Sequence, residues 1–332
     1  MTAELSSPGR ASAAQGLRNP WVAFLIRRLS WLVVSLWVVV TAAFLMIQLV
    51  PGDPVRAALG TSAPAELVQA RRESLGLDDP LPTQYWNHLR SVLTGDFGTS
   101  MTTDLPVSQL VGDRLPTTVT LAALSFVVII LIAVPLGVTI AVLTRGARWR
   151  GGELAFTSAS VVVAAIPEFL LAVGLVYVFA VTLGWFPVAG GDGMGAWVLP
   201  VASLSIGPAA VIARIVRVEV LAVLGQDFVR TARAKRLPPW RIYARHALPN
   251  ALTATLTLTG LLLTGLVAGT VLVENVFALQ GLGSTIVQSI LQKDYPVVQG
   301  IVLVYGALVL LVNLVVDLVL AALDPRSTIR EA

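Results

Sequence analysis

Long runs of uncharged, apolar residues recur along this chain and constrain its fold more than any other feature. A helix needs about 20 consecutive, mostly apolar residues to cross the hydrocarbon core of a bilayer. Six stretches provide such a run, with bounds of about 30–50, 115–144, 155–183, 197–222, 248–274 and 297–323. The sequence therefore predicts an all-α integral membrane protein with six transmembrane helices.

The composition agrees with burial in lipid. Only 13% of the 332 residues are charged, whereas a soluble domain carries roughly a quarter of its residues as charged side chains. There is no cysteine, and the two histidines are His88 and His246. A cysteine nucleophile and a metal site built from thiolates or clustered histidines are therefore excluded. We attribute the net charge of +4 to basic cytoplasmic loops, so no nucleic-acid partner is expected.

The positions of the basic residues predict how the chain is oriented. With the N-terminus in the cytoplasm, most of the 23 Lys and Arg residues fall in cytoplasmic segments, as the positive-inside rule requires. Both termini are then cytoplasmic, with tails at 1–27 and 327–332 around a transmembrane domain at 28–326. The longest external loop covers 51–113, and a basic cytoplasmic loop covers 224–248.

Two short amphipathic helices are expected in the external loop. The first covers 65–75 after Pro64, because proline is favoured in the first turn of a helix. The second covers 84–93, with Thr83 as its N-cap. Its apolar side chains would lie near one face, which either rests at the membrane interface or packs on the bundle. They are Tyr85, Trp86, Leu89 and Leu93.

The cytoplasmic loop predicts a helix, a tight turn and a second helix. The first helix covers 228–236, with Asp227 as its N-cap, and ends before Pro238 and Pro239. The second covers 240–247. The first helix is rich in small and basic side chains, which favour either docking of another protein or contact with anionic lipid. The small residues are Thr231, Ala232 and Ala234, and the basic ones are Arg230, Arg233, Lys235 and Arg236.

This loop carries a specific resemblance. Its segment 227–250 reads DFVRTARAKRLPPWRIYARHALPN, which resembles the "EAA" loop of permeases in binding-protein-dependent ABC transporters. The similar branch transports dipeptides, oligopeptides and nickel. Further matching motifs occur in order along the chain. They are PGDP at 51–54, LGLD at 75–78, GDFGTS at 95–100, RLP at 114–116, ENVF at 274–277, GLG at 281–283, DYPVVQG at 294–300, NLVVD at 313–317 and LDP at 323–325.

The resemblance implies a type I ABC importer permease bundle in the bacterial inner membrane. It implies three kinds of partner besides lipid: a second homologous permease, two cytoplasmic ATPases and an external solute-binding protein. The helix at 228–236 would be the coupling helix that docks on an ATPase. The expected coupling residues are Asp227, Phe228, Arg230, Thr231, Ala232, Arg233, Ala234, Lys235 and Arg236. The family usually has glycine where this chain has Arg236, so Arg236 either lengthens the helix or pairs with the ATPase.

The chain itself is not expected to be an enzyme or to hold a cofactor. A P-loop requires Gly-Lys-[Ser/Thr] to hold phosphate groups, and neither Lys235 nor Lys293 follows a glycine. ATP and magnesium are therefore expected in the partner ATPases.

Charged side chains within the predicted spans are candidates for function, because charge in a membrane is costly. Glu168 lies deep in the third span and would either face the pore or pair with Arg214 or Arg217. These three are the possible pore-lining residues. Glu274 and Asp317 lie near span ends, where interface placement is expected. The GxxxG motif at 265–269 favours close helix contact, either inside this chain or with the partner permease.

The preferred function is alternating-access import of dipeptides or oligopeptides. Nickel and glutathione are alternative solutes for the same machinery. An ion-coupled secondary transporter or a membrane scaffold are alternatives of other classes, although no internal repeat is recognised of the kind expected for the former.

Overall fold

The chain is described by a computed structural model that covers residues 20–49, 52–60, 63–147, 149–190 and 193–323. Within these ranges it is helical and contains no β-strand. The long helices are α1 (Pro20–Gln48), α5 (Val107–Thr144), α8 (Gly195–Leu224), α11 (Leu248–Val276) and α13 (Tyr295–Leu323). The shorter ones are α2 (Pro54–Leu59), α3 (Ala65–Ser74), α4 (Leu81–Thr94), α6 (Arg150–Ala165), α7 (Glu168–Leu175), α9 (Asp227–Ala234), α10 (Pro239–Arg241) and α12 (Leu282–Leu291). The segment η2 (Arg145–Ala147) is a 3₁₀ turn, which is tighter than an α-helix. The segments η3 (Val176–Thr182) and η4 (Ile242–Ala247) are π-helical and therefore wider.

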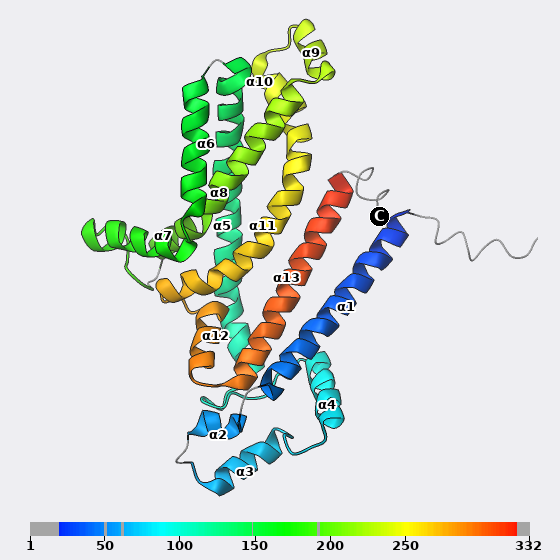
Figure 1. Ribbon diagram of the computed structural model, residues 1–332, viewed down its shortest axis with the longest axis vertical. Helices are drawn as coiled ribbons and strands as arrows, with labels where there is room; N and C mark the ends of the chain where they lie inside the picture. Colours follow the sequence, from blue (N-terminus) through cyan, green and yellow to red (C-terminus); the bar gives the residue numbers. More distant parts are fainter. Residues whose placement is uncertain (1–19, 50–51, 61–62, 148, 191–192, 324–332) are drawn as a thin grey trace, which may run out of the picture.

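Helices α5, α6, α8 and α11 pack into the main bundle, and α1 and α13 lie side by side next to it (Figure 1). The close approach of α5 to α8 depends on Gly137. A Cβ atom there would lie 2.6 Å from the carbonyl oxygen of Ala213 and 2.7 Å from the Cβ of Val216. An ion pair of 2.9 Å between Arg28 and Asp317 joins the beginning of α1 to the end of α13.

The third predicted span, 155–183, is not one helix. The chain bends by 94° between α6 and the helix formed by α7 and η3. Ile166 is extended, with φ −74° and ψ 121°, and Pro167 follows it. A residue before proline is disfavoured in the helical conformation, and proline cannot continue the hydrogen-bond ladder. This sequence signal therefore produces a full break, and α7 projects sideways from the bundle (Figure 1).

Four helices, α1, α5, α8 and α13, are long and apolar enough to cross a membrane, and the bent pair is a fifth candidate. The helix at the expected fifth position, α11, is 29 residues long. Its described apolar part, Leu262–Val276, is shorter than a full span. Four to five spans are therefore established for the described part of the chain.

The two expected helices of the external loop are present as α3 and α4. Helix α3 begins after Pro64 as predicted. Helix α4 begins at Leu81 with Pro80 before it, so the prediction that Thr83 is the N-cap was wrong. Pro82 lies in the first turn, where the missing N–H has no helical partner to lose, and the helix therefore starts three residues earlier.

Candidate coupling surface, pore residue and external cavity

Helix α9 lies at one end of the molecule, beyond the end of α8 (Figure 1). It begins one residue before the expected start and ends at Ala234, with Gln226 at the N-cap position in place of Asp227. Helices α2, α3 and α4 and the short helix α12 lie toward the opposite end (Figure 1). The basic helix α9 and the helices of the loop predicted to be external are therefore separated along the long axis.

The two faces of α9 differ in burial. Val229 and Ala232 are buried and belong to the same hydrophobic core as Ile242 and Ala247 of η4. Ala232 therefore contacts its own chain, which corrects the expectation that it admits a partner protein. The rest of the expected coupling residues are exposed apart from Arg233, which is half-buried. The exposed ones are Asp227, Phe228, Arg230, Thr231, Ala234, Lys235 and Arg236.

Arg233 turns back toward the bundle. Burial, followed by the nearby positive charge of Arg145, lowers the pKa of Arg233, whereas Tyr243 acts in the opposite direction. Its Nη2 atom is buried, with no hydrogen-bond partner among the described residues. Arg230 instead points outward and pairs with Asp227 at 3.2 Å. Arg230 is thus the more accessible of the two guanidinium groups.

Arg236 does not lengthen the helix, which ends at Ala234, and its alternative role of pairing with the ATPase stays a prediction. It adopts a left-handed conformation with φ 52°, and its amide donates to the carbonyl of Arg233 at 2.8 Å. The amide of Leu237 donates to the carbonyl of Ala232 at 3.3 Å. These two bonds form a Schellman motif, in which the left-handed position is usually glycine. The arginine thus keeps the backbone shape that glycine would adopt with less strain.

Helix α9 is connected to two long helices at once. A short turn joins it to α8, and η4 packs against it before running directly into α11. The prediction that the second helix of this loop ends at 247 was therefore wrong. Pro249 lies in the first turn of α11, after the wide π-helical turn of η4. In a wider turn the proline ring does not clash with the preceding turn, and no helical hydrogen bond depends on the N–H that proline lacks.

Glu168, the first residue of α7, lies where α7, α8 and α11 meet. A Cβ atom at Gly269 would fall 2.5 Å from Glu168 Oε2 and 2.9 Å from the Cδ1 of Leu204. Gly269 therefore packs inside this chain, whereas a Cβ atom at Gly265 would meet no atom within 4 Å. The GxxxG motif thus supplies one internal contact and one open position.

The expected pairing of Glu168 with an arginine of α8 is not formed. Arg217 is buried and lies 2.6 Å from Glu153 of α6. Its Nε also donates to Thr144 Oγ1 at 3.2 Å. Arg214 is half-buried on the same helix. Arg217 therefore joins α5, α6 and α8, and Glu168 forms no salt bridge with any described residue.

Two buried acids hold together the end of the molecule opposite α9. Glu274 accepts hydrogen bonds from Thr118 Oγ1 at 2.7 Å and from the amides of Gly283 and Ser284 at the beginning of α12. A carboxylate is stabilising at a helix N-terminus because the free amides and the helix dipole point toward it. Glu274 is fully buried, so its carboxylate contacts other parts of the chain, and the expected placement at the membrane interface stays a prediction. This explains why the ENVF and GLG motifs occur together.

Asp294 has a similar role. It is 1% exposed and accepts hydrogen bonds from Ser100, from the Met101 amide at 3.0 Å and from Thr102 Oγ1 at 2.8 Å. Arg72 likewise joins Asp53 at 3.1 Å to Asp78 at 2.8 Å. The motifs that are scattered through the sequence therefore meet in pairs at this end.

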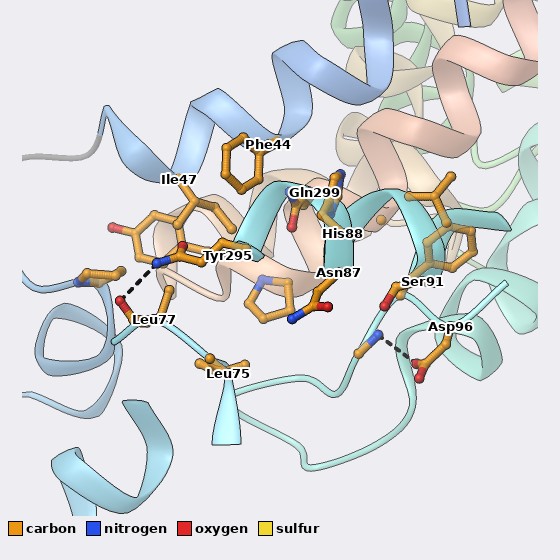
Figure 2. A pocket seen from close by; sticks show the side chains of 18 of the residues that line it. Phe44, Ile47, Leu75, Leu77, Asn87, His88, Ser91, Asp96, Tyr295 and Gln299 are labelled. Carbon is orange, nitrogen blue, oxygen red and sulfur yellow. Dashed lines mark hydrogen bonds between the residues drawn. The ribbon is translucent and has the colours of Figure 1, made fainter. Parts of the chain in front are cut away.

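A cavity of about 320 Å³ lies between α1, α4 and the beginning of α13. Figure 2 shows Phe44 and Ile47 of α1 above it, and His88 and Tyr295 beside it. The rings of Phe44 and His88 are 5.7 Å apart, and Tyr85 packs edge-on against Phe44 at 5.2 Å. One face of α4 thus packs on the bundle, while Trp86 and Leu93 remain exposed.

Comparison with known families accounts for this arrangement. Residues 133–329 match the model described as "Binding-protein-dependent transport system inner membrane component". Residues 21–122 match "Binding-prot-dependent transport system membrane comp, N-term". The chain belongs to this permease family. It is therefore a translocation subunit of an ABC importer in the bacterial inner membrane, where a solute-binding protein and an ATPase are its partners.

Individual relatives agree. The permease is 38% identical over 305 residues to the glutathione transport system permease protein GsiC of Salmonella typhimurium, covering 91% of this chain and 97% of that protein. It is 36% identical to GsiC of Escherichia coli strain K12 over 304 residues, with the same coverage. The inward-facing MetNI methionine ABC transporter has a similar fold, with a TM-score of 0.55 and 22% identity over 65% of this chain and 97% of that chain. Family membership favours the importer over the secondary transporter and the scaffold.

Proposed function

We propose that this permease forms half of a pathway that imports short peptides, glutathione among them, by alternating access. The observation that carries the proposal is the position of α9, which is exposed at one end, joined to α8 by a short turn and packed against η4, which continues into α11. A force applied to its exposed face is transmitted directly to two helices of the bundle. The identity to glutathione permeases supports a small peptide as the solute.

The proposed assembly contains this chain, a second homologous permease, two ATPases and an external binding protein. ATP and magnesium act in the ATPases. The bundle has six spans, with α11 as the fifth, and α9 and both termini face the cytoplasm. Binding of ATP and of the loaded binding protein shifts the same two-state equilibrium, so each favours the other.

The exposed side chains of α9 contact the ATPase in this proposal, and Glu168 faces the pathway. Glu168 has the required position, because it lies where α7, α8 and α11 meet and is not neutralised by a described cation. Arg214 remains a candidate for the pathway wall. Arg217 has a supporting role, because its guanidinium group is occupied by Glu153 and Thr144.

Uptake into proteoliposomes that contain the complete assembly tests this function. We expect glutathione or short peptides to accumulate only with ATP and the binding protein. Accumulation driven by a proton gradient without ATP would refute the proposal, and import of Ni²⁺ alone would refute the peptide solute.

A substitution on α9 tests the coupling role. Thr231 is exposed on α9, and Thr94 is exposed at the opposite end of the molecule. We expect Thr231→Trp to abolish uptake and co-purification of the ATPase, because the indole would obstruct the docking face. Thr94→Trp is the matched control and should retain both. Unchanged uptake in Thr231→Trp would contradict the assignment.

A further inference from the structure

A second cavity, of about 410 Å³, opens at the external end of the molecule. Its wall is formed by the loop after α4, the beginning of α5, the end of α11, one face of α12 and the beginning of α13. This volume is in the range of small-molecule sites in proteins. The residues that the argument uses are Arg114, Asn275, Gln280, Gln288, Gln292 and Asp294.

The two charged groups of this cavity differ in what they can offer a ligand. Among the described residues that line it, Arg114 carries the one positive charge and Asp294 the one negative charge. The carboxylate of Asp294 is already occupied by Ser100, Met101 and Thr102, so it offers little to a ligand. Arg114 donates from Nη1 to Gln280 Oε1, which orients the guanidinium group. Its remaining N–H groups are suited to a carboxylate, which a guanidinium binds with two parallel hydrogen bonds.

The rest of the wall suits a peptide. Gln288 of α12 and Gln292, the residue that follows this helix, are exposed, and an amide group both donates and accepts hydrogen bonds. Such groups match the N–H and C=O groups of a peptide backbone without adding charge. Asn275 is committed to the carbonyls of Val271 and Gly283, so it shapes the wall.

We propose that this cavity is a receiving site for the free carboxylate of a short peptide, with Arg114 as the group that binds it. This inference rests on the proposed function and adds the chemical group that the permease itself recognises. Because Asp294 is occupied, the site does not require a free amino group. The permease therefore distinguishes a peptide acid from its C-terminal amide and accepts an acetylated N-terminus.

The test uses proteoliposomes with the complete assembly and saturating, loaded binding protein. The probes are trialanine, N-acetyl-trialanine and trialanine amide, with glutathione as a second acid. For each probe the uptake rate of Arg114→Gln is divided by that of the wild type, so the selectivity of the unchanged binding protein cancels. We expect a loss of about tenfold for the acids, and little change for the amide.

Two variants keep the result interpretable. Lys293→Gln removes an exposed positive charge at the same end but outside the cavity wall, and should change each rate less than twofold. Arg114→Lys keeps the charge and should retain part of the preference for acids, which covers the case in which Arg114→Gln fails to assemble.

Three results would overturn the inference. Uptake of the acids could be unchanged in Arg114→Gln, or the acids and the amide could lose equally. A loss that disappears at higher concentrations of loaded binding protein would show that Arg114 contacts that protein instead of the solute. In each case ATP-dependent uptake by the wild type would leave the proposed function intact. If the wild type imports none of the probes, the proposed peptide solute fails first.

Discussion

The carboxylate of Asp294 accepts a hydrogen bond from the hydroxyl group of Ser100, 194 residues away in sequence. The same carboxylate accepts the Met101 amide and the Thr102 side chain. Asp294→Asn would place an NH2 group against these donors, and an unsatisfied buried polar group costs about 1–3 kcal/mol. We expect a lower apparent melting temperature of the purified permease in detergent.

A surface aspartate provides the control for that change. Asp113 lies near the beginning of α5 and is exposed. Asp113→Asn should leave the melting temperature within about a degree of the wild type, since surface substitutions usually change stability by less than 0.5 kcal/mol. Equal effects of the two substitutions would show that the buried bonds of Asp294 contribute nothing specific.

The left-handed conformation of Arg236 makes an unusual prediction, because replacement by glycine should stabilise the end of α9. A residue with a Cβ atom costs about 1–2 kcal/mol in this conformation, and part of the gain is offset by the greater freedom of glycine in the unfolded chain. Amide hydrogen exchange over residues 227–237 should therefore slow in Arg236→Gly.

Arg230 offers a matched substitution of opposite sign. It lies inside α9 at an exposed position, where glycine costs about 0.8–1 kcal/mol relative to a good helix former. Exchange over the same residues should therefore accelerate in Arg230→Gly. If both variants accelerate exchange, the side chain of Arg236 stabilises the turn and the strain argument is wrong.

How much of this was accessible from the sequence depends on the kind of signal. Apolar runs placed the long helices because this signal is local, whereas the span predicted over 155–183 is broken before Pro167. The bend of 94° depends on how α7 packs against α8 and α11, which no local pattern encodes. The EAA-like segment located α9, whereas the inward face of Ala232 is set by tertiary contact with η4. The roles of Glu274 and Asp294 were missed because their partners are distant in sequence, although each lies in a recognised motif.

The ion pair between Arg217 and Glu153 provides a test of helix joining at the end of the bundle near α9. Arg217 is buried, and 39% of the Glu153 side chain is exposed. Glu153→Gln leaves a buried guanidinium without its counter-charge. Breaking a fully buried pair costs about 3–5 kcal/mol, and the partial exposure of Glu153 reduces this to about 1–3 kcal/mol. The apparent melting temperature should fall accordingly.

A double substitution separates the pair from its surroundings. In Glu153→Gln with Arg217→Met the unpaired charge is absent, so the melting temperature should recover part of the loss seen in Glu153→Gln. If the loss in the double variant equals the sum of the losses in Glu153→Gln and Arg217→Met, the two side chains do not interact in solution.

Docking of α4 on α1 is expected to weaken on acidification because of His88. Burial lowers the pKa of His88, and a hydrogen bond to the backbone of Val40 offsets this in part. The docked state therefore binds a proton less readily than the undocked state, so its stability rises with pH. The stabilisation is complete above the ordinary histidine pKa of about 6.5 and is lost as the pH falls below it. Amide exchange in α4, corrected for intrinsic rates, should accelerate between about pH 7.5 and 5.5.

His88→Gln tests the assignment, since it removes the titrating group and should abolish this pH dependence. Asp53 does not contribute in the same range. Burial would raise its pKa, but hydrogen bonds from the Val55 amide and Arg72 outweigh this and lower it below the usual 3.8. Its contribution is lost only at more acidic pH. Persistence of the pH dependence in His88→Gln would assign the effect to another group.

The two glycines of the GxxxG motif should respond oppositely to alanine. A methyl group at Gly269 would lie 2.5 Å from Glu168 Oε2 and 2.9 Å from Leu204, whereas Gly265 has open space. Overpacking typically costs about 1–3 kcal/mol, and alanine in place of an unhindered helical glycine stabilises by up to about 1 kcal/mol. Gly269→Ala should therefore lower the apparent melting temperature of the purified permease, and Gly265→Ala should maintain or raise it. Similar tolerance of both changes would show that Glu168 moves away freely and that α7 is not held against α11.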